Sequence, residues 1–276
     1  MAGRDAATNK ADYMTSLAAL QKSLPPDLQA LIADVAWHEN QIGWSGVRVF
    51  RLTAPDGSAR YLKIAEPPHD LTPEMQRLEW LQGRLPVPQL LYFADTFTHQ
   101  YLLMSEISGL VAFHDHFKDQ RGRIIELLAE GLRQIHSVPV TDCPFDNQIA
   151  ALIKRARLNI FEGRVSDKIE GRSPHEVLAE VLATRPDEEN LVFTHGDYCL
   201  PNVLIDPDSL TINGYIDWGQ GGIADPYYDL TQVVRSIVYN FGEDWVAPFW
   251  EAFGVAEIDQ DKLAFFRKLD DLLWIV

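Results

Sequence analysis

The sequence Phe193-Thr-His-Gly-Asp-Tyr-Cys-Leu-Pro-Asn202, followed by Ile216-Asp-Trp-Gly219, decides the fold of this chain. Between the two segments lie two short apolar runs that read as strands, and Pro207-Asp-Ser between them marks a turn. In an antiparallel hairpin the start of one strand lies beside the end of its partner. The side chains that border this hairpin, Asn202 and Asp217, should therefore be neighbours.

A second carboxylate, that of Asp197, lies in the Gly- and Pro-marked loop before Asn202. We expect it to face the same space as Asn202 and Asp217. Carboxylate and amide oxygens, completed by water and phosphate, suit Mg²⁺ far better than zinc. The stretch therefore predicts a magnesium site with a further carboxylate beside it.

The length, charge and cysteine content of the chain exclude some classes of protein. A chain of 276 residues with 46% hydrophobic content can form one large domain or two smaller ones around a real core. The net charge of −16 argues against a nucleic-acid partner and would attract a polycationic small molecule, although acidic surfaces often serve solubility alone. Cys143 and Cys199 form no Cys-x-x-Cys pair, which favours a reducing compartment and excludes a disulfide framework.

The N-terminal residues 1–22 contain no continuous hydrophobic segment. This pattern predicts neither a signal peptide nor a membrane span, and it favours a cytoplasmic protein. No obligate protein partner is evident from the sequence.

The periodicity of apolar residues divides the chain into three parts. Residues 1–35 read as a helical leader, and residues 36–106 as a small α+β lobe. Its expected strands, at residues 47–53, 60–65, 90–94 and 100–105, lie on either side of one helix. Residues 107–276 are mostly helical, and their only β signal is the hairpin described above. This is an α+β, bilobal plan with a β-rich N-lobe and a larger helical C-lobe, and the cleft between lobes is the default ligand site.

A lysine and a glutamate in the first lobe form a candidate pair. Lys63 lies in an apolar strand, where a lone lysine usually faces solvent. Glu74 shares a helix face with Leu78 and Leu81, so it should point inward and need a partner. A strand lysine paired with a glutamate of the next helix positions ATP phosphates in kinases. The Gly-rich residues 43–46 could also hold a phosphate through their N–H groups and the Ser45 hydroxyl, or could be an ordinary loop.

Taken together, these motifs resemble those of the aminoglycoside phosphotransferase family, which has a protein-kinase-like fold, and most closely its 3′-phosphotransferases. The matching segments cover nearly the whole chain beyond the leader: residues 43–51, 61–63, 74, 81–88, 102–106, 143–146, 195–202, 216–222, 224–225 and 269–272.

The resemblance implies roles on the ATP side. Lys63 would contact the α- and β-phosphates with Glu74 orienting it, and Tyr61 would stack on adenine. The backbone of Ser105 and Ile107 would read the adenine edge. Asn202 and Asp217 would ligate Mg²⁺. Asp197 would accept or orient the proton of the substrate hydroxyl, while His195 would brace the loop.

The resemblance also implies an acidic site for the ammonium groups of an aminoglycoside, formed by Asp167, Glu170, Asp270 and Asp271. Carboxylates form charge-assisted hydrogen bonds with ammonium groups, and several of them select polycations. Three departures from the family pattern fall on this side. Gln220 stands where arginine is common, the loop before Gly171 has fewer acids, and the chain continues past residues 270–273 with residues 274–276.

The first hypothesis is thus an ATP- and Mg²⁺-dependent kinase of an aminoglycoside hydroxyl, most simply the 3′-hydroxyl, which would confer resistance. The alternative keeps the kinase machinery and changes the acceptor to another antibiotic or metabolite. A metal-dependent hydrolase would need further His and Asp ligands, and the remaining histidines form no such motif. A non-catalytic nucleotide-binding module would be expected to lack Lys63, Asp197 or a metal ligand.

Overall fold

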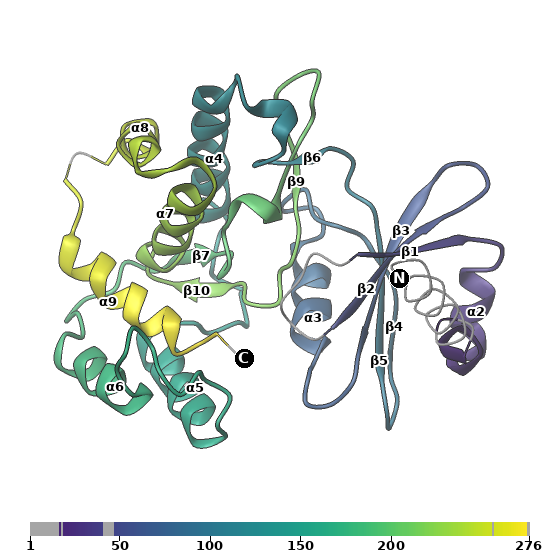
Figure 1. Ribbon diagram of the computed structural model, residues 1–276, viewed down its shortest axis with the longest axis horizontal. Helices are drawn as coiled ribbons and strands as arrows, with labels where there is room; N and C mark the ends of the chain where they lie inside the picture. The colour runs from purple at the N-terminus through teal and green to yellow at the C-terminus, as the bar shows by residue number, and fades with distance from the viewer. Residues whose placement is uncertain (1–16, 18, 41–46, 256, 275–276) are drawn as a thin grey trace, which may run out of the picture.

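The computed structural model describes residue 17 and residues 19–40, 47–255 and 257–274. Figure 1 shows the twisted N-terminal sheet at one end of the molecule and a larger, mainly helical C-terminal part at the other. Within the described residues no helix is both long and apolar enough to cross a membrane.

The N-terminal sheet is antiparallel, with the strand order β1-β2-β3-β5-β4. Its strands are β1 (Ala36–Asn40), β2 (Arg48–Thr53), β3 (Ala59–Ala65), β4 (Leu90–Asp95) and β5 (Gln100–Ser105). The sequence pattern predicts the last four of these strands, whereas β1 was not expected.

Two helices cover opposite faces of this sheet: α2 (Pro26–Leu31) lies on the outer face and α3 (Thr72–Leu81) on the face toward the C-lobe (Figure 1). Side chains of a strand alternate between faces. Leu62 and Ile64 accordingly pack in the outer cluster with Leu28. Lys63, between them, is directed to the α3 side.

The C-terminal part is mainly helical. Its helices are α4 (Arg121–His136), α5 (Ile149–Phe161), α6 (Pro174–Ala183), α7 (Tyr227–Phe241), α8 (Val246–Phe253) and α9 (Gln260–Asp271). The apolar stripe of α4 is buried from Ile124 to Ile135, as the periodicity predicts.

The expected hairpin is present as β8 (Val203–Ile205) and β9 (Ile212–Tyr215). The expectation that this lobe holds no other β structure is wrong. β6 (Leu110–Val111) pairs with β8, and β7 (Val192–Thr194) pairs antiparallel with β10 (Gly222–Ala224). These strands are too short to produce a recognisable alternation in sequence. The boundaries at residues 35 and 106 stay predictions.

Candidate active site

The first contact of the site joins β3 to α3. Lys63 Nζ lies 2.8 Å from both carboxylate oxygens of Glu74. Glu74 is 4% exposed, so its charge needs this partner. The contact expected from the helix spacing is therefore present.

A second contact of the same lysine crosses between the lobes. Lys63 Nζ lies 3.1 Å from Oδ1 of Asp217, whose side chain is 52% exposed. Burial alone would lower the pKa of Lys63, but the charges of Asp217 and Glu74 outweigh it and the pKa rises. The charge of Lys63 in turn lowers the pKa of Asp217, which holds that carboxylate ionised.

The hairpin brings Asn202 and Asp217 together as its geometry predicts. The N–H of Ile216 donates to the Asn202 carbonyl at 3.0 Å, so the residues that border the two strands are adjacent. Asp217 adopts a left-handed backbone with φ of 65°, which is uncommon for a residue other than glycine. Such backbone strain concentrates at functional sites.

Asp197 lies beside Asn202. The Asn202 amide Nδ2 donates to the Asp197 carbonyl at 2.9 Å and to its Oδ2 at 3.0 Å. Burial, followed by the charges of Asp217 and Asp270, raises the pKa of Asp197 to about 7. A carboxylate with a pKa near neutrality is matched to the work of a general base.

His195 connects this loop to the hairpin and is fully buried. Its Nε2 lies 3.0 Å from the Ile216 carbonyl, and its Nδ1 accepts the N–H of Asp197 at 3.3 Å. Those two partners fix the tautomer with the proton on Nε2, and burial lowers the pKa of the ring. His195 is therefore held neutral, which agrees with a bracing role and not with that of a base.

Asp229, a residue that the sequence reading missed, anchors the start of the same loop. Its buried carboxylate accepts the N–H of His195 at 2.9 Å and the N–H of Gly196 at 2.8 Å. His136 Nε2 lies 3.0 Å from the same carboxylate. The available signal was an acid at a buried position of the apolar helix α7, which calls for specific partners.

Gly196 allows the loop to pass close to the segment that follows Asp217. A Cβ at this position would lie 2.0 Å from the Gln220 carbonyl oxygen, and φ is 79°. Only glycine satisfies both constraints. Asp197 and Asp217 are thus held by backbones that are in direct contact.

The donor set fits Mg²⁺. Both amide hydrogens of Asn202 go to Asp197, which leaves its carbonyl Oδ1 on the other side of the amide as a ligand atom. Together with the ionised Asp217 this supplies two hard oxygens, and Mg²⁺ commonly takes its other ligands from water and nucleotide phosphates. Among the described residues, no group of three or more His, Cys, Asp or Glu side chains could hold a metal ion by itself.

A family model described as the phosphotransferase enzyme family matches residues 37–266. The chain belongs to this phosphotransferase family.

Relatives of this phosphotransferase match over nearly their full length. An aminoglycoside 3′-phosphotransferase of Niallia circulans is 35% identical over 257 residues, covering 91% of this chain and 97% of that protein. One of Streptomyces fradiae is 35% identical over 252 residues, covering 85% and 94%.

Solved structures agree with the sequence comparison. An aminoglycoside 3′-phosphotransferase of type VIII superposes with a TM-score of 0.81 at 30% identity, covering 89% of this chain and 96% of that one. A Streptomyces rimosus aminoglycoside phosphotransferase in complex with ADP and streptomycin gives a TM-score of 0.75 at 29% identity, covering 90% and 96%. The resemblance and the bilobal protein-kinase-like fold are confirmed.

The expected nucleotide contacts of the phosphotransferase that the structure describes lie on β3, at the end of β5 and just after β5. Tyr61 is half-buried against the core on the same face as Lys63. The N–H of Ser105 donates to the Gln89 carbonyl at 2.9 Å. The expected contact of the Ser105 backbone with an adenine edge would therefore use the Ser105 carbonyl. Ile107 is half-buried beside it. Ser45 lies outside the described residues.

The four acids expected to bind the acceptor differ in burial and in their ion pairs. Asp270 is 3% exposed and is held by Gln232, by Arg235 at 2.7 Å and by the Trp274 indole at 3.1 Å. Burial raises the pKa of Asp270, although the charge of Arg235 opposes the shift.

The other three expected acids lie nearer to solvent. Asp271 accepts from Arg235 at 3.0 Å, and Glu170 pairs with Arg267 at 3.1 Å. Asp167 is exposed. The structure thus joins Asp270 and Asp271 through one arginine, while Asp167 and Glu170 belong to the loop between α5 and α6.

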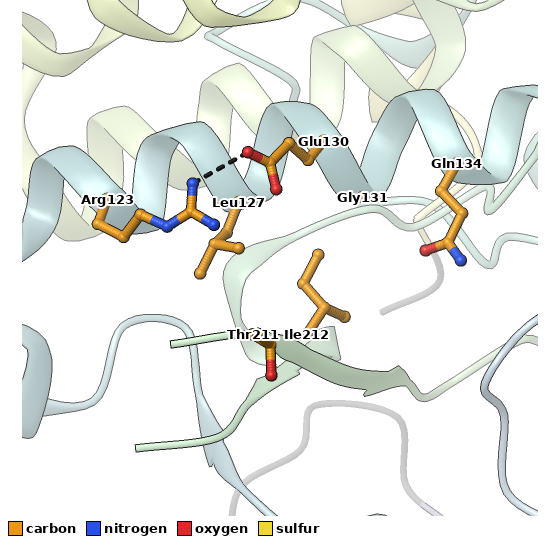
Figure 2. A pocket seen from close by; sticks show the side chains of 7 residues that line it. All are labelled: Arg123, Leu127, Glu130, Gly131, Gln134, Thr211 and Ile212. Atoms are coloured by element: carbon orange, nitrogen blue, oxygen red, sulfur yellow. Dashed lines mark hydrogen bonds and ion pairs between the residues drawn. The ribbon is translucent and has the colours of Figure 1, made fainter. Parts of the chain in front are cut away.

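A separate cavity of about 290 Å³ lies between α4 and the hairpin (Figure 2). It is lined by Arg123, Leu127, Glu130, Gly131, Gln134, Thr211 and Ile212. At its wall a Cβ on Gly131 would come within 2.8 Å of the hydroxyls of Tyr198 and Tyr215. This close approach lets α4 pack against the catalytic loop, residues 195–202, and against the hairpin. The cavity shares no lining residue with the candidate active site.

Proposed function

We propose that this phosphotransferase transfers the γ-phosphoryl group of ATP to a hydroxyl of an aminoglycoside, most simply the 3′-hydroxyl, with Mg²⁺ as cofactor. The observation that carries the proposal is the convergence of Lys63, Asn202, Asp217 and Asp197 at the junction of the two lobes. The names of the relatives support the acceptor class.

In this proposal Lys63 holds the α- and β-phosphates, and Glu74 keeps its ammonium in place. When bound to Asn202 and Asp217, Mg²⁺ would neutralise phosphate charge and lower the pKa of nearby Asp197. Phosphoryl transfer depends on positioning and charge neutralisation more than on covalent help, so no nucleophilic side chain is required.

Asp197 acts on the acceptor. The acceptor oxygen forms a bond to the γ-phosphorus as the bond from that phosphorus to the β,γ-bridging oxygen breaks, and ADP leaves with the electron pair. The hydroxyl proton passes to the Asp197 carboxylate. Asp167, Glu170, Asp270 and Asp271 form the acidic site for ammonium groups of the acceptor, in which Asp270 is buried.

A coupled ADP-release assay with a panel of matched aminoglycosides tests this proposal. Compounds with a 3′-hydroxyl are expected to give ADP release in the presence of Mg²⁺, whereas their 3′-deoxy counterparts are not. Equal turnover of both sets of compounds would show that the phosphoryl group is transferred to a hydroxyl other than the 3′-hydroxyl. No ADP with any aminoglycoside would shift the proposal to a different small-molecule acceptor.

A further inference from the structure

Gln232, on the buried face of α7, touches two parts of the site that lie far apart in sequence. Its Nε2 donates to the Gly196 carbonyl at 2.8 Å and to Oδ1 of Asp270 at 3.1 Å. Gly196 directly precedes Asp197, and Asp270 lies on α9 among the expected acceptor-binding acids. One amide group therefore spans the space between the catalytic loop and the acceptor side.

The orientation of this amide is fixed by chemistry. A carbonyl and a carboxylate accept hydrogen bonds, so only the NH₂ end of the side chain can meet both. Both of its hydrogens are used in this way. Turning the amide over would place its oxygen between two acceptors.

The contact comes at a cost to stability. Gln232 is 6% exposed, and its Oε1 is buried with no hydrogen-bond partner among the described residues. An unpaired buried acceptor destabilises a fold, and an apolar side chain in the same space would avoid the penalty. A buried polar residue that leaves a hydrogen-bond acceptor unpaired is better explained by function than by stability.

We propose that Gln232 is a positioning residue, which ties Asp270 to the Gly196 carbonyl and so holds Asp197 in the geometry needed for transfer. This inference rests on the proposed function, because it assigns Asp270 to the acceptor side. Gly196 is then held from two directions, by Asp229 at its N–H and by Gln232 at its carbonyl. Arg235, which pairs with Asp270 at 2.7 Å, keeps the far end of the link in place.

The test replaces Gln232 by a side chain of similar length that lacks both donors. In Gln232→Met we expect kcat for the acceptor to fall about tenfold or more while the KM for ATP stays within about twofold, because a small displacement of a catalytic group is costly to rate. Gln232→Glu keeps the size and supplies at most one of the two hydrogens, so it should change kcat in the same direction. If Gln232→Met fails to fold, Gln232→Glu provides the same test of kcat.

Thr231→Val is the matched control. Thr231 neighbours Gln232, is 2% exposed, and its hydroxyl has no hydrogen-bond partner among the described residues. Removing that hydroxyl should leave kcat and both KM values within about twofold. A comparable loss of kcat in Thr231→Val would assign the effect to disturbed packing of α7 and overturn the inference.

Amide hydrogen exchange of residues 195–199 gives a readout that needs no acceptor. In the ligand-free Gln232→Met protein these amides should exchange about fivefold faster than in the wild type, with no change in Thr231→Val. If wild-type protein releases no ADP with any aminoglycoside, the proposed function fails, yet exchange still decides the inference. Unchanged exchange together with unchanged kcat would remove Gln232 from any positioning role.

Discussion

Lys63 Nζ and Asp217 Oδ1 lie 3.1 Å apart, although one residue is on the N-terminal sheet and the other follows a hairpin of the C-lobe. The same ammonium is 2.8 Å from Glu74. A single cation therefore connects a strand, a helix and the proposed metal-binding segment. Its removal should affect stability and nucleotide binding together.

Lys63→Met tests this connection. The change leaves Glu74 buried without its cation, and removing one partner of a buried pair destabilises a protein, here by about 2 kcal/mol after allowing for the exposed Asp217. The KM for ATP should rise about tenfold, because the lysine contact with the phosphates is lost. Urea unfolding and steady-state kinetics measure the two effects.

The exposed Lys118 provides the control for that variant. Lys118→Met makes the same chemical change on the surface and should alter the free energy of unfolding by no more than about 0.5 kcal/mol. Equal urea midpoints for Lys63→Met and the wild type would show that the buried pair does not support the fold.

Asp217→Asn should weaken the binding of Mg²⁺ and lower the rate of the reaction. The variant loses the ionised ligand oxygen, so the Mg²⁺ concentration for half-maximal rate should rise about tenfold and kcat should fall about a hundredfold. Asp208→Asn makes the same charge change in the exposed turn at the opposite end of the hairpin and should leave both quantities unchanged. An unaltered Mg²⁺ dependence in Asp217→Asn would exclude this carboxylate as a ligand.

Asp197→Asn should abolish turnover and also change the pH dependence of stability. The folded pKa is raised from 3.8 to about 7, since burial and then the charges of Asp217 and Asp270 disfavour the carboxylate. Between these values the folded state binds the proton more tightly than the unfolded state. The free energy of unfolding of the wild type therefore falls as pH rises across this window.

In metal-free buffer the asparagine variant should match the wild type near about pH 4 and be more stable by about 2 kcal/mol at about pH 8. This value is roughly half of the free energy that corresponds to the pKa change of Asp197, at about 1.4 kcal/mol for each pH unit. Urea titrations at several pH values, with a chelator present, measure the difference. Parallel pH profiles for the two proteins would contradict the raised pKa. Retained turnover would contradict the proposed role of Asp197.

Asp271→Asn should weaken acceptor binding more than catalysis. Loss of one carboxylate removes one charge-assisted contact with an ammonium group, so the acceptor KM should rise about three- to tenfold with little change in kcat. Asp167→Asn should act in the same direction. Raising the ionic strength should reduce the difference from the wild type, because screening weakens the contact that the variants lack. Acceptor KM values that equal the wild type at low salt would remove these acids from the acceptor site.

The local part of the site could be predicted from sequence. The hairpin that joins Asn202 to Asp217 follows from two apolar runs and a turn, and the contact of Lys63 with Glu74 follows from strand alternation and helix spacing. Both depend on residues close in the chain. The catalytic roles of these residues stay predictions.

The rest depends on contacts between distant segments. Gln232 reaches Gly196 and Asp270 only because α7 lies between the catalytic loop and α9. The periodicity of apolar residues does not predict this packing. The short strands β7 and β10 pair across many intervening residues for the same reason. The pairing of Arg235 with Asp270 was equally hidden, since an acid near the C-terminus looks available for a ligand until its neighbours are known.

The arginines that already accompany the acidic side chains make acceptor binding an exchange of counter-ions. Arg235 forms ion pairs with both Asp270 and Asp271, and Arg267 forms one with Glu170. On the proposed function, an entering ammonium group gains only the difference between its own contact and the one it displaces. A molecule with a single positive charge gains this small difference once, whereas a molecule with several gains it at each carboxylate. The number of positive charges on the acceptor therefore determines how well it is selected.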